Sequence, residues 1–278
     1  MDYDVALVTG ASSGIGREIA RELANPSTRR TPRARTIVLT ARRGERLEAL
    51  RRELADAEGG ADPTFDATDC RVVAADLATT DGRRRIAEFL TSNALTVDLL
   101  VNNAGIGGWG RFDRQERDRI SAMMEVNVIA ATELARLLLP DMVAKGQGGI
   151  LNIASVAAFQ PGPFTALYYA TKSFLLSLSE GLSEELSGSG VRVCAYCPGP
   201  VATEFMASAG LSRESSERDL RSYPGPKAVA SAALTALAAG RRVAIHGFRY
   251  KAMVFLERFL PRRVVAWAIG RFQRARLV

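Results

Sequence analysis

The sequence predicts an α/β fold, a parallel sheet with helices on both faces, and three observations favour it. Short apolar runs typical of buried strands alternate along the chain with stretches whose apolar residues recur at helical spacing. A glycine-rich turn, TGASSGIG at residues 9–16, separates the first such strand from the first such helix. The chain has 278 residues, 47% hydrophobic and 24% charged, which is typical of a globular protein with a large core. Strands alternating with helices in this way build a three-layered, doubly wound parallel sheet.

The expected elements follow in order along residues 1–247, which we interpret as one domain. Strands are expected at residues 5–9, 36–41, 71–75, 97–101, 149–154, 191–197 and 243–245. Helices are expected directly after the glycine turn and at residues 45–57, 80–95, 111–145, 169–186 and 227–239. The Arg-rich stretch 25–35 is expected to be a mobile surface loop, and the Ser-rich stretch 206–226 a substrate-side loop or lid with a short helix.

The glycine turn predicts a dinucleotide site. Gly10, Gly14 and Gly16 lie between a buried strand and a helix, where glycines let the backbone approach a pyrophosphate at the helix N-terminus. After the second strand, where such folds commonly carry an acid for the ribose 2′-hydroxyl, the chain has Arg42 and Arg43. A guanidinium there suits a 2′-phosphate, which favours NADP over NAD. The alternative is that Arg42 only begins the solvated face of the next helix.

Polar side chains follow several strands at the edge where an open α/β sheet binds ligands. Ser155 follows the fifth strand, and the sequence NNAG at residues 102–105 follows the fourth. Asp76 follows the third strand, either to accept a hydrogen bond from an adenine amino group or to begin a helix. Asn127 lies in an apolar helical stretch, where its amide must find partners in the core or in a site.

Tyr168 and Lys172 are spaced i, i+4, so on a helix they share one face. A phenol with a pKa of about 10 is a poor acid or base at neutral pH, and a nearby cation lowers that pKa. The pair therefore predicts a general acid/base. On its own the spacing also fits a surface Tyr and Lys.

Other residues limit the class of protein. Three cysteines and a single histidine give neither a disulfide framework nor a metal site, and the C-x-x-C of Cys194 and Cys197 lies in an apolar strand. The start lacks the basic segment of a signal peptide and no apolar run reaches 18 residues, so we expect a cytoplasmic protein. The net charge of +7 comes mostly from arginine clusters. Nucleic acid, an anionic membrane, a phosphorylated cofactor and a general arginine bias would each explain it, but nucleic-acid binding lacks a reader motif.

The tail at residues 248–278 mixes large apolar residues with Arg and Lys around Pro261. This pattern predicts a basic amphipathic helix pair broken at the proline. Three roles stay open from the sequence: peripheral contact with a membrane, a cover over the substrate pocket, and a subunit contact.

Taken together, these motifs resemble the short-chain dehydrogenase/reductase family over nearly the whole chain. The matching pieces are TGASSGIG, Asp76, NNAG, Asn127, Ser155, YYATK with Tyr168 and Lys172, and PGPVAT at residues 198–203. Tyr169 is out of register with Lys172, so the resemblance selects Tyr168. It implies a Rossmann sheet of seven strands and NADP(H) bound by a set of residues that cradles the dinucleotide. That set is Gly10, Ser12, Ser13, Gly14, Ile15, Gly16, Arg42, Arg43, Asp76, Leu77, Asn103, Ala104, Gly105, Tyr168, Lys172, Pro198, Gly199, Val201 and Thr203.

The resemblance also implies roles. Ser155 and Tyr168 would bind a carbonyl oxygen, Lys172 would lower the pKa of Tyr168 and hold the nicotinamide ribose, and Asn127 would keep a proton-supplying water chain. The expected activity is NADP(H)-dependent interconversion of a carbonyl and a secondary alcohol on a hydrophobic substrate, in a homodimer or homotetramer. The long loop and the basic tail depart from a minimal member of the family. The alternative function is a non-catalytic NADP-binding regulator or a membrane-surface protein.

Overall fold

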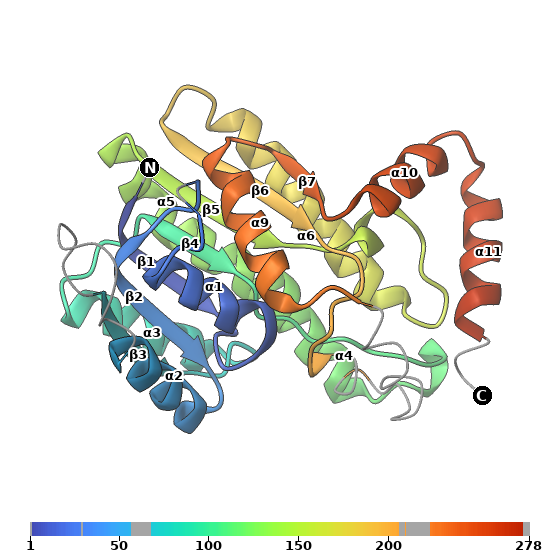
Figure 1. Cartoon of the computed structure of the whole chain (residues 1–278). Helices are drawn as coiled ribbons and strands as arrows, with labels where there is room; N and C mark the ends of the chain where they lie inside the picture. Colours follow the sequence, from blue (N-terminus) through green and yellow to red (C-terminus); the bar gives the residue numbers. More distant parts are fainter. Residues whose placement is uncertain (1, 29, 57–67, 206–208, 210–222, 275–278) are drawn as a thin grey trace.

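A parallel sheet forms the centre of the structure, a computed structural model that describes residues 2–28, 30–56, 68–205, 209 and 223–274 (Figure 1). Its seven strands have the order β3-β2-β1-β4-β5-β6-β7, and all neighbours are parallel, as the sequence predicted. The strands are β1 Tyr3–Thr9, β2 Ala34–Ala41, β3 Asp69–Ala74, β4 Leu99–Asn102, β5 Gly148–Ile153, β6 Val191–Cys197 and β7 Val243–Ile245.

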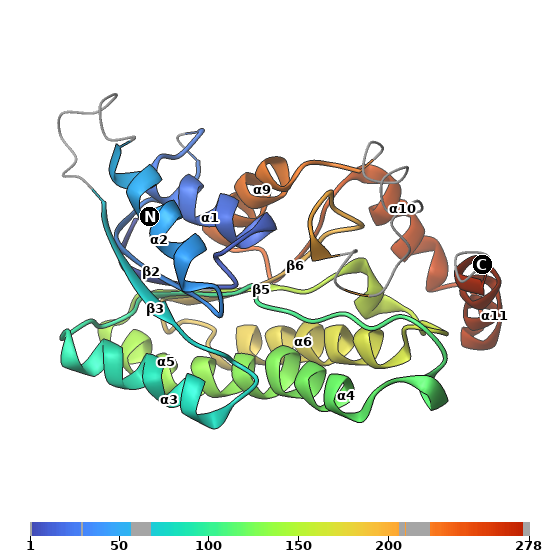
Figure 2. The ribbon, with the colours of Figure 1, turned by 90° about the horizontal axis from the view of Figure 1, so that it is seen from below.

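Helices cover both faces of this sheet, which gives the three layers that the alternation of strands and helices predicts (Figure 2). One face carries α1 Gly14–Ala24, α2 Gly44–Asp56 and α9 Pro226–Ala238. The opposite face carries α3 Thr80–Ser92, α4 Arg117–Met124, α5 Ala131–Lys145 and α6 Ala166–Glu185.

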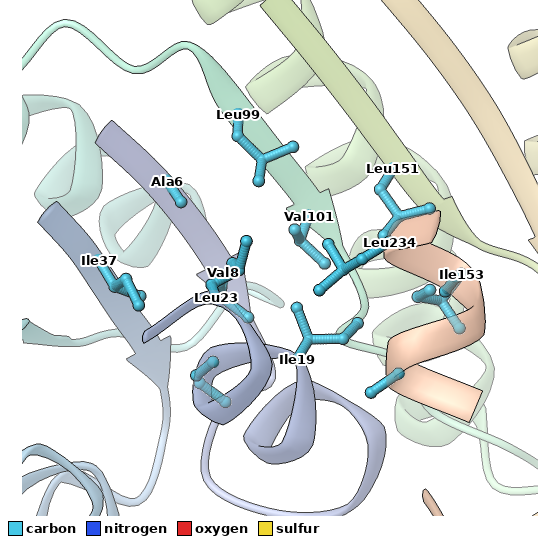
Figure 3. Close-up of a cluster of buried hydrophobic side chains, with 14 of the residues drawn as sticks. Ala6, Val8, Ile19, Leu23, Ile37, Leu99, Val101, Leu151, Ile153 and Leu234 are labelled. Atoms are coloured by element: carbon cyan, nitrogen blue, oxygen red, sulfur yellow. The ribbon is translucent and has the colours of Figure 1, made fainter. Parts of the chain in front are cut away.

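The first face is packed with aliphatic side chains (Figure 3). Val8 and Val101 of the sheet meet Ile19 of α1 and Leu234 of α9, and all four are fully buried. Burying such a side chain stabilises the fold by roughly 1.5–3 kcal/mol. The neighbouring residue Leu7 points to the other face, because successive strand residues alternate, and there it packs with residues of α3 and α5. The central strands β4 and β5 are therefore buried at every residue, which is why they are mostly apolar.

Several elements differ from the sequence-based bounds. β2 begins at Ala34, inside the expected loop 25–35, and Thr31 just before it is buried, so the end of that stretch packs on the domain. The expected helical region 111–145 contains a π-helical turn, η3 Glu125–Ala130, between α4 and α5. Helical periodicity does not reveal one inserted residue, so this turn could not be predicted from the sequence. Most of the expected lid, 206–226, lies outside the described residues.

The tail forms two helices that flank Pro261, as expected: α10 Phe248–Glu257 and α11 Arg262–Arg274. They lie at the margin of the molecule, beyond α6 and the connection that precedes it (Figure 1). Tyr250 of α10 fills the space over Gly199, since a Cβ there would lie 2.3 Å from the Tyr250 ring. Gln273 of α11 is buried and donates a hydrogen bond to the Tyr169 hydroxyl at 3.1 Å. The tail is thus attached next to the segments that follow β5 and β6.

Candidate active site

The predicted catalytic residues come from three elements, η3, η4 with its N-cap and α6, and lie close together. Ser155 stands two residues after β5 as the N-cap of a 3-10 turn, η4 Val156–Phe159, and its Oγ accepts a hydrogen bond from the Ala157 amide at 3.1 Å. Tyr168 and Lys172 lie one turn apart on α6, with the Lys172 Nζ 5.8 Å from the centre of the Tyr168 ring. A Cβ on Gly105 would lie 3.6 Å from Lys172 Nζ and 3.5 Å from Asn127 Oδ1. The carboxyl edge of the sheet therefore brings together the residues that the sequence separated.

Lys172 is held in place by the sheet. Its Nζ donates a hydrogen bond to the Ile153 carbonyl oxygen at 2.8 Å, at the end of β5, and the side chain is 5% exposed. Burial lowers the pKa of Lys172 to about 8, because removing water disfavours the ammonium form. The group therefore remains largely protonated at neutral pH, but closer to titration than an ordinary lysine.

Burial also raises the pKa of the Tyr168 phenol, and a hydrogen bond with Ser155 opposes that rise only in part. The net shift of this pKa is therefore upward, opposite to the fall that the spacing predicted, and the contribution of Lys172 to it stays a prediction. The physical reason is that sequence spacing shows the charge partner but not the loss of water around the phenol. A phenol that stays protonated at neutral pH is suited to donate a proton.

Asn127 lies in the π-helical turn η3. Such turns frequently occur at functional sites. Its Oδ1 accepts the Ile106 amide at 2.8 Å, and its Nδ2 donates to the Ile106 carbonyl at 2.9 Å and to Thr171 Oγ1 at 3.0 Å. Thr171 in turn donates to the Tyr168 carbonyl oxygen at 2.8 Å. Asn127 thus joins the segment after β4 to the helix of Tyr168, and its expected part in a water chain stays a prediction.

The glycine turn has the conformation that a pyrophosphate cradle requires. Gly10 and Gly14 have positive φ angles of 68° and 57°. A Cβ on Gly16 would lie 2.6 Å from the Gly10 carbonyl oxygen, so only glycine fits there. The N-cap of α1 is Ser13, whose side chain makes no capping hydrogen bond, and the first turn contains no acid. The amides at this N-terminus are consequently suited to an anion, while Ile15 packs partly into the core.

Arg43, rather than Arg42, contacts this turn. Its guanidinium donates to Ser12 Oγ at 3.1 Å and to Ser13 Oγ at 2.9 Å, and also to the Glu204 carboxylate at 2.9 Å. Arg42 is exposed. Two serine hydroxyls and a guanidinium beside a helix N-terminus form a donor set that fits a phosphate.

The remaining predicted binding residues border the same edge. Asp76 accepts a hydrogen bond from the Ala78 amide at 3.0 Å within its turn, and Leu77 is buried. Asn103 donates through Nδ2 to the Thr9 carbonyl at 2.9 Å, which ties the ends of β4 and β1. A Cβ on Gly14 would lie 3.1 Å from Thr203 Cγ2, so the segment after β6 reaches the glycine turn. The other predicted cofactor-binding residues lie after β4, at Ala104 and Gly105, and after β6, at Pro198, Gly199 and Val201.

Four residues that the sequence reading missed also shape the site. Thr9 accepts hydrogen bonds at Oγ1 from the amides of Asn103 and Ala104, and it directly precedes the glycine turn. Phe205 packs against Tyr168 with ring centres 5.5 Å apart. The sequence neighbours of Thr171, in the motif YYATK, and of Glu204 could have suggested a place in the site. Their hydrogen-bond partners, Asn127 and Arg43, lie far along the chain and could not be read from the sequence.

Known proteins resemble this chain in sequence and in fold. The family described as short chain dehydrogenase matches residues 4–214. The chain is 33% identical over 213 residues to serine 3-dehydrogenase from Agrobacterium fabrum, covering 76% of this chain and 78% of that protein. A short-chain dehydrogenase from Sphingobium yanoikuyae, solved in complex with NADPH, superposes with a TM-score of 0.76 at 32% identity, over 92% of this chain and 94% of that one. A bulky-bulky ketone specific alcohol dehydrogenase from Comamonas testosteroni gives a TM-score of 0.72 at 27% identity, over 93% of each chain.

Proposed function

The chain belongs to the short-chain dehydrogenase family, and from this premise we propose that it is an NADP(H)-dependent oxidoreductase that interconverts a carbonyl and a secondary alcohol on a hydrophobic substrate. The observation that carries the proposal is the convergence of Ser155, Tyr168 and Lys172 beside a glycine turn built for a dinucleotide. A non-catalytic regulator on this fold has no need of an acid, a hydroxyl and an ammonium in one place.

The cofactor assignment rests on the donor set at the end of β2. Arg43 with the hydroxyls of Ser12 and Ser13 suits the 2′-phosphate of NADP(H), and no described contact there offers a carboxylate on β2 for a ribose 2′-hydroxyl. The NADPH complex of the Sphingobium yanoikuyae relative supports the same cofactor here.

The roles of the side chains follow from their contacts. Bound NADPH supplies the hydride for reduction. Ser155 and Tyr168 bind the carbonyl oxygen of the substrate, and Tyr168 donates its phenolic proton to that oxygen as negative charge develops. Lys172, fixed by the Ile153 carbonyl, places a positive charge 5.8 Å from the ring centre and stabilises the phenolate that remains. Asn127 keeps Thr171 and the start of α6 in register with the segment after β4.

The substrate class follows from what surrounds Tyr168. Phe205 lies on its ring, and the turn after Ser155 consists of apolar residues, Val156–Phe159. Apolar side chains thus lie beside both Tyr168 and Ser155, which favours a hydrophobic ketone or alcohol. The ketone specificity named for the Comamonas testosteroni relative supports this class.

The proposal is tested with a panel of hydrophobic ketones, aldehydes and secondary alcohols, read by NADPH absorbance with NADH run in parallel. We expect turnover of bulky ketones with NADPH and a lower rate with NADH at equal concentration. Preference for NADH would contradict the cofactor assignment. Turnover confined to polar hydroxy acids or sugars would contradict the substrate class.

We further propose that the tail binds an anionic membrane surface, because charge and apolar area are concentrated there. Residues 248–278 contain eight of the 37 Lys and Arg residues but one of the 30 acids, which leaves 29 of each in residues 1–247. The whole net charge of +7 thus resides in the tail, and a general arginine bias does not explain that division. The described part of the tail also exposes large apolar side chains: Phe248, Phe255, Leu256, Phe259, Leu260, Val264, Trp267 and Phe272.

Such a helix pair would lie in the interface between lipid headgroups and water. In the described parts of the chain no helix has the length and hydropathy needed to cross a bilayer. Flotation with vesicles containing anionic lipid should recover the protein, and Arg262→Glu with Arg263→Glu should abolish recovery. The matched control is Arg84→Glu with Arg85→Glu on α3, at the far end of the molecule (Figure 2), which should float normally. Equal recovery of both variants would end this proposal.

We also propose a homodimer or homotetramer that pairs through α5 and α6. Leu137 and Val143 on α5 and Phe174 on α6 are each about two-fifths exposed, and a partner subunit packed on these helices would remove them from water. Light scattering should give a multiple of the 30.0 kDa chain mass, and Leu137→Glu should reduce it. A monomeric wild-type protein at all concentrations would contradict the pairing.

A further inference from the structure

Glu204, in the segment after β6, makes an ion pair with two arginines at the predicted 2′-phosphate site. Its carboxylate accepts hydrogen bonds from Arg43 Nη1 at 2.9 Å and from Arg46 Nη1 at 2.9 and 3.0 Å. Residues 43 and 204 are far apart in sequence, so the pair depends on the reach of this segment across the edge of the sheet. Neither the family motifs nor the proposed reaction requires an acid at this place.

The surroundings of this carboxylate are otherwise donors. Arg43 also donates to the hydroxyls of Ser12 and Ser13, which can turn their own protons outward. The first turn of α1, which begins at the next residue, contains no acid. A site for an anion is thus formed by two guanidinium groups, two hydroxyls and a helix N-terminus. Among the described contacts, the anion that Arg43 binds is the Glu204 carboxylate. Both arginines lower the pKa of Glu204, so the carboxylate is charged at neutral pH.

We propose that Glu204 is an internal counter-anion that competes with the 2′-phosphate of NADP(H) for Arg43 and Arg46, and so sets how strongly the protein prefers NADP(H) over NAD(H). This inference rests on the proposed NADP(H) function. A cofactor with a 2′-phosphate can replace the carboxylate on both guanidinium groups, whereas NAD(H) has no anion at that position to exchange for it. Glu204 therefore reduces the affinity for NADP(H) and leaves that for NAD(H) nearly unchanged.

The expected size of the effect is small, because all three groups are partly solvated. The side chains of Arg43, Arg46 and Glu204 are 44%, 48% and 57% exposed. Ion pairs at such exposure contribute little and are screened by salt. We expect about a two- to fivefold change in Kd at low ionic strength, and less at about 0.5 M salt.

The experiment measures the Kd values of NADPH, NADH and adenosine 2′,5′-bisphosphate by calorimetry on the full-length wild-type protein and on Glu204→Gln. The variant should bind NADPH and the bisphosphate about two- to fivefold more tightly, and NADH with unchanged affinity. Glu184→Gln, which removes another exposed ion pair, with Arg242, is the matched control and should change none of the three.

Four outcomes would overturn the inference. Weaker NADPH binding by Glu204→Gln would mean that Glu204 holds the cofactor in place instead of competing with it. Equal tightening of NADPH and NADH would mean that its effect does not involve the 2′-phosphate. A wild-type preference for NADPH that Glu204→Gln leaves unchanged would overturn this inference alone, whereas a wild-type protein that binds neither dinucleotide would overturn the proposed function with it.

Discussion

Residues 1–247 and the tail differ in where their apolar side chains lie and in how their charges balance. In the first part, strands and helices enclose their aliphatic residues on both faces of the sheet, and positive and negative residues are equal in number. In the described tail, eight large apolar side chains are exposed beside the arginines, against six in the rest of the described chain. The first part buries its own apolar residues and balances its own charges, whereas the tail leaves most of its large apolar side chains exposed.

The comparison shows what each part needs in order to be stable. The sheet and its helices bury enough apolar area to fold as a unit. The contacts that attach the tail include Tyr250 over Gly199 and the hydrogen bond from Gln273 to Tyr169, and both lie near the active-site segments. A change in the domain should therefore alter chemistry or global stability, and a change on the outside of the tail should alter surface binding alone.

The largest effect is expected from Tyr168→Phe. Loss of the phenolic proton should lower kcat by about 10²- to 10⁴-fold, the usual contribution of a general acid, because the proton donor is removed while the ring remains. NADPH affinity and flotation with vesicles should be nearly unchanged, since neither depends on that hydroxyl. Steady-state rates, calorimetry and flotation on the same preparation measure all three. Normal turnover would refute the catalytic role and favour the non-catalytic alternative.

The second-largest effect is expected on the free energy of unfolding, which should respond differently to a substitution in the domain and to one in the tail. Ile37→Ala removes a fully buried side chain from β2 and should lower the free energy of unfolding by about 2–5 kcal/mol. Phe255→Ala in α10 removes a side chain that is 59% exposed and should change it by less than about 0.5 kcal/mol. Denaturant unfolding with a common m-value measures both. A comparable loss in the tail variant would show that the tail belongs to the cooperative core.

The pH dependence should differ between chemistry and surface binding. Burial raises the pKa of Tyr168, so the phenol is protonated at neutral pH and only a small fraction can accept a proton. Alcohol oxidation, which needs that base, should therefore rise by about tenfold per pH unit between pH 6 and 8. Carbonyl reduction should not rise, and vesicle binding should stay constant because arginine remains charged. Oxidation that is flat over this range would contradict the raised pKa.

The smallest effect is expected at Glu257, where the tail meets the domain. Burial raises the pKa of this carboxyl, and its Oε2 has no hydrogen-bond partner among the described residues. A raised folded-state pKa means that the ionised form weakens the packing, and that the packing tightens as pH falls through that pKa. Glu257→Gln should therefore raise the hydrogen-exchange protection factors of the α11 amides at pH 7.5 and remove the pH dependence of those protection factors. Glu184→Gln is the control, and faster exchange in Glu257→Gln would contradict the account.

Much of the fold was predictable because the signals are local. A strand such as β6 is a mostly apolar run, interrupted by Arg192, whose bounds the sequence predicted. The break at Pro261 follows from a missing amide and a fixed φ. The π-helical turn around Asn127 was not predictable, since one extra residue in a turn hardly alters apolar periodicity. The start of β2 was misplaced because polar residues at a strand end resemble a loop.

The sequence by itself determined which groups this protein can use: the phenol and ammonium one turn apart, the glycines that admit a phosphate, and a tail that holds the entire net charge. The tertiary structure decided which partners those groups contact and how far they are removed from water. It selected Arg43 over Arg42 for the glycine turn, brought Glu204 to the same guanidinium, and raised the pKa of Tyr168 by burial where spacing alone predicted a fall. The physical reason is that identity and spacing are properties of the chain, whereas solvation and the partners of a charge depend on segments that meet only after folding.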